Sequence, residues 1–426
     1  MRSLGEWLAY IETLHPKAIA MGLDRVAEVA ARVDVRIECP VVTVAGTNGK
    51  GSTCAMLESM LRHAGYRTGL YMSPHLARYN ERVTIAGEEA SDAALVAAFE
   101  AVEKARAAAG EPTALTYFEF GTLAALSLFA DAALDVLILE VGLGGRLDAV
   151  NIVDADVAVV TTIDIDHVDY LGTTREDIGR EKAGIFRAGR PAICGDPDPP
   201  RSLVAHAQAI GADLLAIGRD FRYAAEGRAQ WRYESAAGSR YGLPFPALRG
   251  AYQLANAATA LAALDALRER LPVATSAVRE GLVHVTLAGR FQVMPGRPAT
   301  VLDVAHNVQA ARVLADSLGT MGFFPRTLGV FGMLADKDIE GVARALAPRI
   351  DAWHVAPLPG PRGATVERLA SALLAAGVAA DAIRRHPDVE HAFAAARDDA
   401  TEADRIAAFG SFLTVAAALA AARDRR

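Results

Sequence analysis

A chain of 426 residues is too long for one ordinary hydrophobic core, so we expect two or three domains. Its residues are 52% hydrophobic and 22% charged, which is typical of a packed globular protein and excludes a largely disordered one. The formal net charge of −7 gives the chain as a whole no electrostatic reason to bind nucleic acid or an anionic membrane, and we expect neither as a partner.

Cysteine usage and the amino-terminal sequence both favour a cytoplasmic protein. The cysteines, Cys39, Cys54 and Cys194, are too sparse for a disulfide framework or a thiolate metal site. The opening "MRSLGEWLAYIETLH" is amphipathic and contains acids, unlike a secretory signal. No apolar run reaches the length of about 18 residues that a membrane helix needs, so we predict no membrane span.

The first part of the chain alternates buried strands with helices. Residues 41–44 predict a strand, a helical pattern runs from 51 to 64, and "YRTGLYMS" predicts a second strand ending at Ser73. After helices near 91–108 and in "TYFEFGTLAALSLFA", two apolar runs predict strands that end at Glu140 and near His167. Because these strands are apolar throughout rather than at every second residue, they indicate a parallel sheet covered on both faces.

The rest of the chain changes pattern twice. Residues 219–248 alternate aromatic and polar side chains with glycine breaks, which predicts short antiparallel strands, and a helix follows at 252–267. The α/β pattern then restarts, with strands expected in "ATVLDVAHN", "TLGVFGML", "AWHVAPL" and "RIAAFGS". We therefore expect an α/β fold with a larger domain at 1–288, a linker at 289–298 and a smaller Rossmann-like domain at 299–426.

The stretch "VTVAGTNGKGS" at 42–52 is the strongest local signal for chemistry. The usual P-loop pattern has a longer spacer between its first glycine and the Gly-Lys pair than the two residues between Gly46 and Gly49. Glycines between a strand and a helix start let backbone N–H groups approach an anion, and Lys50 adds charge. A hydroxyl at Ser52, or at the next residue, could reach a metal ion. A plain strand-to-helix turn is the alternative, but this composition favours phosphate binding.

Candidate metal ligands follow the predicted strands. Glu140 lies at the carboxyl edge of a parallel sheet, where ligands bind in such folds, and its oxygens suit Mg²⁺. Asp148, in the glycine-rich loop after it, could orient a substrate. His167 and Ser73 also end strands, although a lone histidine is more often structural and Ser73 could be an ordinary turn residue. The acids around His167 could equally be solvated loop charges.

Two further signals are weaker. Lys182 lies in the mixed-charge helical segment "GREKAGIF", where a lysine is usually solvated. Asp303 and His306, in "LDVAHN", follow a strand of the second domain and so lie at another ligand-binding edge. Two such edges facing each other would enclose a nucleotide and shield a reactive intermediate from water.

Taken together, the motifs resemble a known family. "VAGTNGKGST", "SPHLARYNERVTIAG", "TYFEFGTLAAL", "ILEVGLGGRLDAVNIV", "GREKAGIFR", "LAGRF", "LDVAHN" and "GMLADKDI" are similar, in order, to motifs of the folylpolyglutamate synthase family in the ATP-dependent Mur ligase superfamily. The likeness is greatest to the bacterial bifunctional dihydrofolate synthase/folylpolyglutamate synthases. It implies a Mur-ligase-like P-loop ATPase domain followed by a glutamate-ligase domain.

The resemblance also implies roles for individual residues. The positions that match nucleotide contacts are Thr47, Asn48, Gly49, Lys50, Gly51, Ser52, Asn256, Arg290, Asp303 and His306. The resemblance implies a pair of Mg²⁺ ions, and the positions that match their ligands are Ser73, Glu140, His167 and Lys182 as a carbamate. The positions that match the pterin-binding segments are Thr116, Tyr117, Phe118, Glu119, Leu147, Asp148 and Ala149. The residues expected to act in catalysis are Lys50, Lys182, His167 and Arg290.

The implied reaction is amide ligation through an acyl phosphate, with dihydropteroate or tetrahydrofolate as the acceptor of L-glutamate and ATP as co-substrate. Arg290 falls in the predicted linker, where domain closure could deliver it to the phosphates, and Ala288 stands where many relatives have proline. A monomer is the family expectation. The sequence leaves open a folylpolyglutamate synthase without the first activity, a peptidoglycan-type ligase, a small-molecule kinase or other P-loop ATPase, and a nucleotide-binding regulator.

Overall fold

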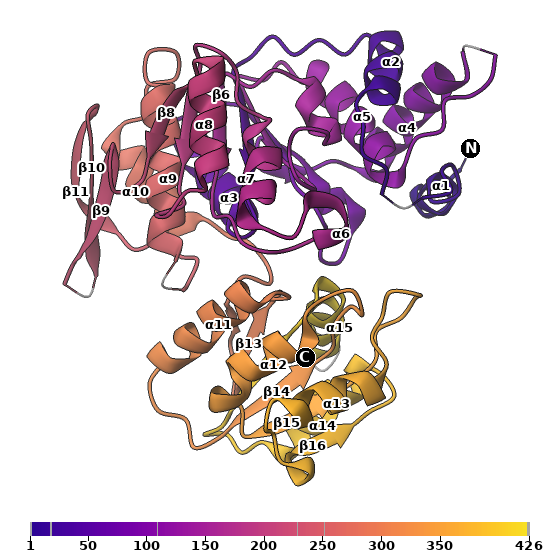
Figure 1. Cartoon of the computed structure of the whole chain (residues 1–426), viewed down its shortest axis with the longest axis vertical. Helices are drawn as coiled ribbons and strands as arrows, with labels where there is room; N and C mark the ends of the chain where they lie inside the picture. Colours follow the sequence, from indigo (N-terminus) through magenta and orange to yellow (C-terminus); the bar gives the residue numbers. More distant parts are fainter. Residues whose placement is uncertain (1, 18, 109, 228, 251, 424–426) are drawn as a thin grey trace. The chain divides into compact units, whose positions relative to one another are not determined.

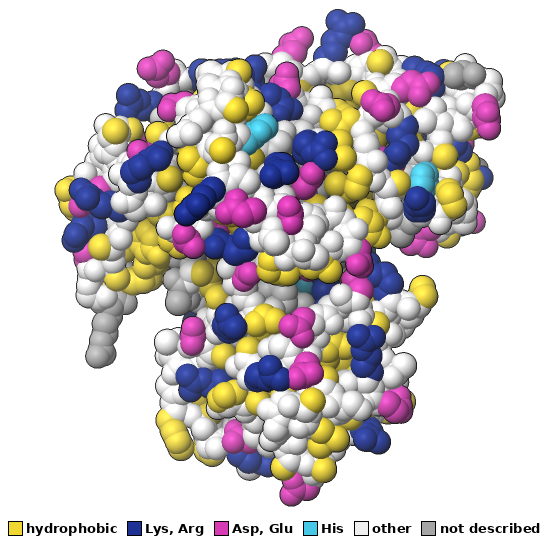
Figure 2. All heavy atoms as spheres, in the orientation of Figure 1, with side chains coloured by type: hydrophobic (Ala, Val, Ile, Leu, Met, Phe, Trp, Pro, Cys, Tyr) yellow, Lys and Arg dark blue, Asp and Glu magenta, His cyan; other side chains and the backbone are white. Residues whose placement is uncertain are grey.

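The molecule contains two separately packed units. The structure is a computed structural model that describes residues 2–17, 19–108, 110–227, 229–250 and 252–423. Contacts between residues group 1–247 with 254–285 as the first unit and 248–253 with 286–426 as the second. Acidic and basic side chains are interspersed on the face of each unit that Figure 2 shows.

The first unit is built on an eight-stranded sheet. Its strands follow the order β4-β3-β2-β5-β1-β6-β7-β8, and all neighbours from β2 to β8 are parallel. This confirms the parallel sheet that the apolar runs predict; the short antiparallel edge formed by β3 and β4 was not expected. The strands are β1 (Val41–Ala45), β2 (Thr68–Tyr71), β3 (Val83–Ile85), β4 (Glu88–Glu89), β5 (Val136–Glu140), β6 (Val157–Val160), β7 (Pro191–Cys194) and β8 (Asp213–Ala216).

Helices cover this sheet and bury their apolar sides in one large core. α3, which follows the phosphate loop, is buried along almost its whole length because it packs against both the sheet and α10. The helices of the first unit are α1 (Leu4–Ile11), α2 (Asp24–Val33), α3 (Lys50–His63), α4 (Asp92–Ala107), α5 (Tyr117–Ala130), α6 (Val168–Leu171), α7 (Arg175–Ala183), α8 (Arg201–Ile210), α9 (Gln253–Ala266) and α10 (Thr275–His284). Two 3-10 turns, η1 (Tyr79–Arg82) and η2 (Ala149–Ile152), lie in loops at the sheet edge.

A separate antiparallel sheet completes the first unit. It consists of β9 (Phe221–Glu226), β10 (Gln230–Ser235) and β11 (Gly238–Pro244), so the expectation of short antiparallel strands is confirmed. Trp231 and Tyr233 alternate inward and are fully buried. In Figure 1 this sheet lies at the opposite end of the first unit from α1 and α2.

The second unit has a six-stranded sheet of its own, in the order β12-β13-β17-β14-β15-β16, with only β12 antiparallel to its neighbour. In its core, Trp353 packs edge to face on both Phe331 and Phe409. Its strands are β12 (Gln292–Met294), β13 (Ala299–Asp303), β14 (Thr327–Phe331), β15 (Ala352–Val355), β16 (Ile383–Arg385) and β17 (Arg405–Phe409). Its helices are α11 (Val308–Thr320), α12 (Ile339–Leu346), α13 (Val366–Ala375), α14 (Val389–Asp399) and α15 (Phe412–Arg423).

Three segments differ from the sequence-based expectation. β6 ends at Val160, so His167 is not at the end of a strand: the threonines after Val160 bond to the phosphate loop instead of continuing the ladder. β2 ends at Tyr71, because the N–H of Ser73 donates to the side chain of Glu140. The stretch 289–298, expected as a linker, contains β12. Among the described residues, no helix is both long and apolar enough to cross a bilayer.

Candidate active site

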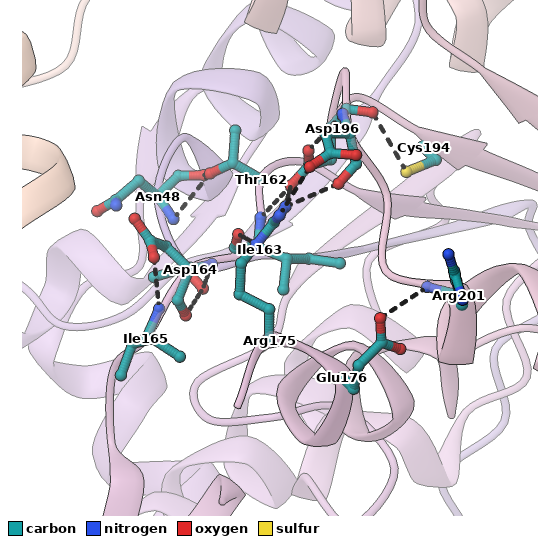
Figure 3. Close-up of polar contacts among 12 residues, drawn as sticks. Asn48, Thr162, Ile163, Asp164, Ile165, Arg175, Glu176, Cys194, Asp196 and Arg201 are labelled. Carbon is teal, nitrogen blue, oxygen red and sulfur yellow. Dashed lines mark hydrogen bonds and ion pairs between the residues drawn. The ribbon is translucent and has the colours of Figure 1, made fainter. Parts of the chain in front are cut away.

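The phosphate loop lies between β1 and α3, in the middle of the first sheet. The loop after β6 holds it in place: the N–H of Thr47 donates to the carbonyl of Thr162 at 2.6 Å, and the Thr47 hydroxyl donates to the carbonyl of Asp164 at 3.0 Å. The N–H of Asn48 donates to the Thr162 hydroxyl at 3.3 Å, as Figure 3 shows. Hydrogen bonds to residues 162 and 164, in the loop after β6, therefore hold the short phosphate loop in place.

Glycine is required at position 49 for two reasons. Gly49 has φ +87°, in the left-handed region, and it is the N-cap residue of α3. A Cβ atom there would lie 2.5 Å from Oδ1 of Asn256, which is buried on α9 against the loop. Because no side chain caps this helix start, its first N–H groups and its dipole favour an anion.

Lys50 folds back over the loop. Its ammonium donates to the carbonyls of Gly46 at 3.0 Å and Thr47 at 3.3 Å, so its charge is held beside the same helix start. Ser52 is buried in the first turn of α3. The hydroxyl of the next residue, Thr53, is also buried and has no hydrogen-bond partner among the described residues.

Two of the predicted metal ligands are in direct contact. Glu140 ends β5, is buried, and accepts a hydrogen bond from the backbone N–H of Ser73 at 3.0 Å. β5 pairs with β1 on one side and β2 on the other, so both residues reach the edge next to the phosphate loop. Carboxylate and hydroxyl oxygens suit a hard divalent cation.

His167 reaches the same edge by an irregular loop rather than a strand. It has φ +51° and its N–H donates to Oδ1 of Asp166 at 2.8 Å. Figure 3 shows how the preceding residues are anchored: the N–H of Ile163 donates to Asp196 at 2.7 Å, and Nε of Arg175 donates to the carbonyl of Ile163 at 2.9 Å. The Asp166 side chain is 9% exposed, so this acid is not a solvated loop charge.

The expectation of a solvated Lys182 is wrong. The residue lies in the last turn of α7 and is 4% exposed. Burial, with the positive charge of Lys50, lowers the pKa of Lys182 to about 7, against the opposing effect of Asp166 and Asp148. Lys182 therefore lies close enough to Lys50, Asp148 and Asp166 to be affected by their charges, although these residues are far apart in the sequence.

The residues at this edge could supply part of the coordination shell of a metal ion, and the remaining ligands would have to be oxygens of a bound ligand or of a modified side chain. Within the described parts of the chain, no three His, Cys, Asp or Glu side chains gather into a metal-binding cluster. Ser73 and Glu140 supply adjacent hard oxygens, and His167 lies on the loop beyond β6. An ion here would require further ligands, such as phosphate oxygens or a carbamate on Lys182.

Asp148 and Phe118 form the best-defined part of the expected pterin site. Asp148 is 4% exposed, and burial raises its pKa to about 7 although the N–H groups of Leu143 (2.8 Å) and Val150 (3.1 Å) donate to it. The Phe118 ring packs on the backbone of Gly142, where a Cβ would lie 2.6 Å from Cζ. Leu147 and Ala149 flank Asp148, half-buried and buried respectively.

Of the three remaining residues expected in the pterin site, Thr116 and Glu119 hold the start of α5. The Thr116 hydroxyl and N–H both donate to Oε2 of Glu119, at 2.9 and 2.8 Å, in a capping box. Glu119 also forms a 2.6 Å ion pair with Arg25. Their polar groups are used within the protein, which leaves the half-buried rings of Tyr117 and Phe118 as the parts of this segment able to meet a ligand.

Three predicted nucleotide contacts lie in the second unit, around the end of β13. Asp303 is buried and accepts from the N–H groups of Phe291 and Ala305, both at 2.8 Å. Burial raises the pKa of Asp303, and the charge of Arg290 opposes this. The guanidinium of Arg290 lies 4.9 Å from the ring centre of Phe412, and the His306 ring lies 6.4 Å from it.

Sequence reasoning missed Phe412, the residue around which Arg290 and His306 gather, and undervalued Asp166. The only sequence signal for Phe412 is its place at a helix start directly after a strand and a glycine, in "AFGSF". That position is the ligand-binding edge of a parallel sheet.

Comparison with known proteins agrees with this architecture. The Mur ligase middle domain profile matches residues 44–264, and the Mur ligase, glutamate ligase domain profile matches 289–412. The chain is 49% identical to the dihydrofolate synthase/folylpolyglutamate synthase of Escherichia coli (strain K12), over 97% of this chain and 94% of that protein. It is 41% identical to the Haemophilus influenzae protein of the same name, over 97% and 96%.

Solved structures give the same result. E. coli FolC in complex with DHPP and ADP superposes with a TM-score of 0.93 at 48% identity, covering 100% of this chain and 99% of that one. A bifunctional folylpolyglutamate synthase/dihydrofolate synthase with Mn, AMPPNP and L-glutamate bound superposes with a TM-score of 0.90 at 47% identity, covering 99% and 98%.

Fold, phosphate loop and matched domains define an ATP-dependent ligase of the Mur type. Within that class, the chain belongs to the dihydrofolate synthase/folylpolyglutamate synthase family. The family resemblance of the sequence motifs is thereby confirmed.

Proposed function

We propose that this ligase joins L-glutamate to the carboxylate of a pterin-bearing acceptor, and that it accepts both dihydropteroate and tetrahydrofolate. The observation that carries the proposal is the gathering of the phosphate loop, the Ser73–Glu140 pair, Lys182 and Asp148 at one edge of the first sheet. Relatives at 49% and 41% identity, named for both synthase activities, support the choice of acceptors.

The chemistry begins with activation of the acceptor. A carboxylate oxygen of the acceptor attacks the γ-phosphorus of ATP, the bond to the β-phosphate oxygen breaks, and an acyl phosphate and ADP result. The amine of L-glutamate then attacks the acyl carbon, inorganic phosphate leaves, and the amine loses a proton as the amide forms. The loop N–H groups and Lys50 offset the charge that develops on the phosphoryl oxygens.

A bound divalent cation would supply further charge neutralisation at the transferring phosphate. We propose Mg²⁺, with two ions per site, held by Ser73, Glu140, His167 and a carbamate on Lys182. A relative was solved with Mn and AMPPNP, which supports a divalent ion beside the nucleotide. The hard oxygens of Ser73 and Glu140 suit Mg²⁺ as well as Mn²⁺.

The environment of Lys182 favours carbamate formation. With a pKa of about 7, an appreciable fraction of its amine is neutral at neutral pH. The neutral nitrogen can attack CO₂, forming an N–C bond and releasing one proton. The product is an anion in a site that contains the charge of Lys50, so a buried repulsion is replaced by an attraction.

In the acceptor site, Asp148 and Phe118 have the clearest roles. The Asp148 carboxyl can hydrogen-bond the N–H groups of a pterin ring, and the Phe118 ring offers a flat apolar face. Arg290, Asp303 and His306 are the proposed nucleotide contacts of the second unit. We expect a monomer that acts in the cytoplasm, as the sparse cysteines favour.

The second candidate function is a folylpolyglutamate synthase without the first activity; a Mycobacterium tuberculosis folylpolyglutamate synthase has the same fold at 33% identity. ADP release by purified protein with ATP, Mg²⁺ and L-glutamate, with each acceptor in turn, separates the two. We expect turnover with both acceptors. Turnover with tetrahydrofolate alone would select the second candidate, and turnover with neither would contradict both.

A further inference from the structure

Arg82 is a buried cation that the proposed mechanism does not use. It ends the turn η1 and is 8% exposed. Its guanidinium lies 5.2 Å from the ring centre of Tyr79 and 5.4 Å from that of Tyr117, and its Nε donates to Nδ1 of His75 at 2.9 Å. These partners are neutral rings, so they leave the charge of Arg82 uncompensated.

No carboxylate among the described residues lies within ion-pairing distance of this guanidinium. Its sequence neighbour Glu81 is occupied by the N–H groups of Leu76, Ala77 and Arg78, at 2.6 to 2.8 Å. Other arginines nearby are paired, such as Arg78 with Glu89. A buried cation without an anion is costly, and the pairing that lowers this cost can come from a ligand.

Arg82 is placed beside the reacting edge. Its carbonyl accepts the N–H of Met72 at 2.9 Å, directly before Ser73. Burial raises the pKa of Tyr71, the charge of Arg82 opposes this rise and that of Asp148 adds to it, so both side chains lie near the Tyr71 hydroxyl. Tyr117 lies in the segment already assigned to the acceptor. Through Tyr71 and Tyr117, the guanidinium is therefore next to the proposed acceptor site.

The two proposed acceptors differ by one anion. Dihydropteroate has a single carboxylate, and that group reacts. Tetrahydrofolate has a glutamyl tail with two carboxylates, of which one reacts and the other is a spectator. A spectator carboxylate that enters a buried site must be paired, and a planar guanidinium that lacks a carboxylate partner is the matching group.

We propose that Arg82 binds the spectator carboxylate of tetrahydrofolate-type acceptors and so lets one site take the longer acceptor. This inference rests on the proposed function. It makes Arg82 a specificity determinant that is needed for one acceptor and dispensable for the other.

The test compares Arg82→Gln with Arg78→Gln, a matched control on the same turn whose side chain is 68% exposed. Arg82→Gln should raise KM for tetrahydrofolate about tenfold or more, since it removes charge-assisted hydrogen bonds. It should leave KM for dihydropteroate at the value of the control. Arg82→Lys, which keeps the charge and loses the fork, should fall between. An equal rise for both acceptors, or a rise for neither, would overturn the inference.

A second measurement begins with the unaltered protein, and this first part does not depend on how the variants fold. Tetrahydrofolate whose spectator carboxylate is replaced by a carboxamide should lose the same factor in KM, and Arg82→Gln should no longer distinguish acid from amide. An amide that serves as well as the acid would overturn the role of Arg82. If the unaltered protein uses neither natural acceptor, the proposed function itself falls, which is a different outcome from an insensitive Arg82.

Discussion

Lys50 and Lys182 lie at the same sheet edge, but the fold holds them there in different ways. The ammonium of Lys50 is held by two carbonyls of its own loop, close in sequence. Lys182 is buried at the end of α7, and burial with the charge of Lys50 lowers its pKa to about 7. The Lys50 site depends on local sequence and presents a cation, while the Lys182 site depends on tertiary packing and holds a buried lysine with a lowered pKa. Position in the fold, rather than residue type, therefore decides the role.

The largest loss of activity is expected for Lys50, the lysine that is held by its own loop. Lys50→Ala should reduce ADP release with either acceptor by at least about 1,000-fold, because it removes the charge nearest the transferred phosphate. Lys104→Ala, an exposed lysine in the last turn of α4, should change nothing. Turnover that persists in Lys50→Ala would show that the loop does not activate the phosphate.

Lys182→Met should lower turnover about 100-fold, because it removes the proposed carbamate ligand. In the unaltered protein supplied with ¹³C-labelled bicarbonate, NMR should show a carbamate signal that grows as pH rises through about 7, since only the neutral amine reacts. The signal should be absent from Lys182→Met and present in Lys104→Met. A fully active Lys182→Met protein would remove the contrast between the two lysines.

The buried side chain of Asp148 predicts how the stability of the protein depends on pH. Its folded pKa of about 7 lies above the ordinary aspartate pKa of 3.8, so the folded protein binds more protons than the unfolded one between these values. Its contribution to stability is therefore present at low pH and is lost as pH rises from 3.8 to about 7, by up to about 4 kcal/mol.

Urea unfolding at several pH values checks this prediction. The free energy of unfolding of Asp148→Asn should lack that pH-dependent loss, although the amide offers one acceptor oxygen where the carboxylate offers two to Leu143 and Val150. Parallel pH profiles for the two proteins would mean that Asp148 is not the group that titrates.

The smallest effect is expected at Phe118. Phe118→Leu should raise KM for both acceptors about three- to tenfold, because an aromatic contact is replaced by an aliphatic one. Phe323→Leu, at a position that is 90% exposed, is the control. A loss confined to kcat would instead indicate that the ring positions the reacting groups.

Much of the fold could be predicted because its signals are local. Continuous apolar runs predict the central parallel strands, and glycines with Lys50 predict the phosphate loop. The end of β6 was misjudged because Thr161 and Thr162 look like strand residues, while their hydroxyls bond to Asn48. β12 was missed because three residues at a sheet edge are too short to leave a pattern.

The candidate site was harder to predict where tertiary contacts make it. Nothing near Lys182 in sequence shows that it is buried beside Lys50, and its assignment depended on family resemblance. Thr116 and Glu119 fit the capping-box pattern, and the structure gives both residues that role at the start of α5. The role of Arg82 depends on the absence of an anion around it within the described residues, which only three-dimensional contacts reveal.

The most direct test of the account follows oxygen atoms. The acceptor carboxylate is labelled with ¹⁸O, the protein is supplied with ATP, Mg²⁺ and L-glutamate, and the released phosphate is analysed by mass spectrometry. Activation as an acyl phosphate predicts that each phosphate carries one ¹⁸O from the acceptor. Phosphate without label, released together with the amide product, would contradict the proposed ligase mechanism.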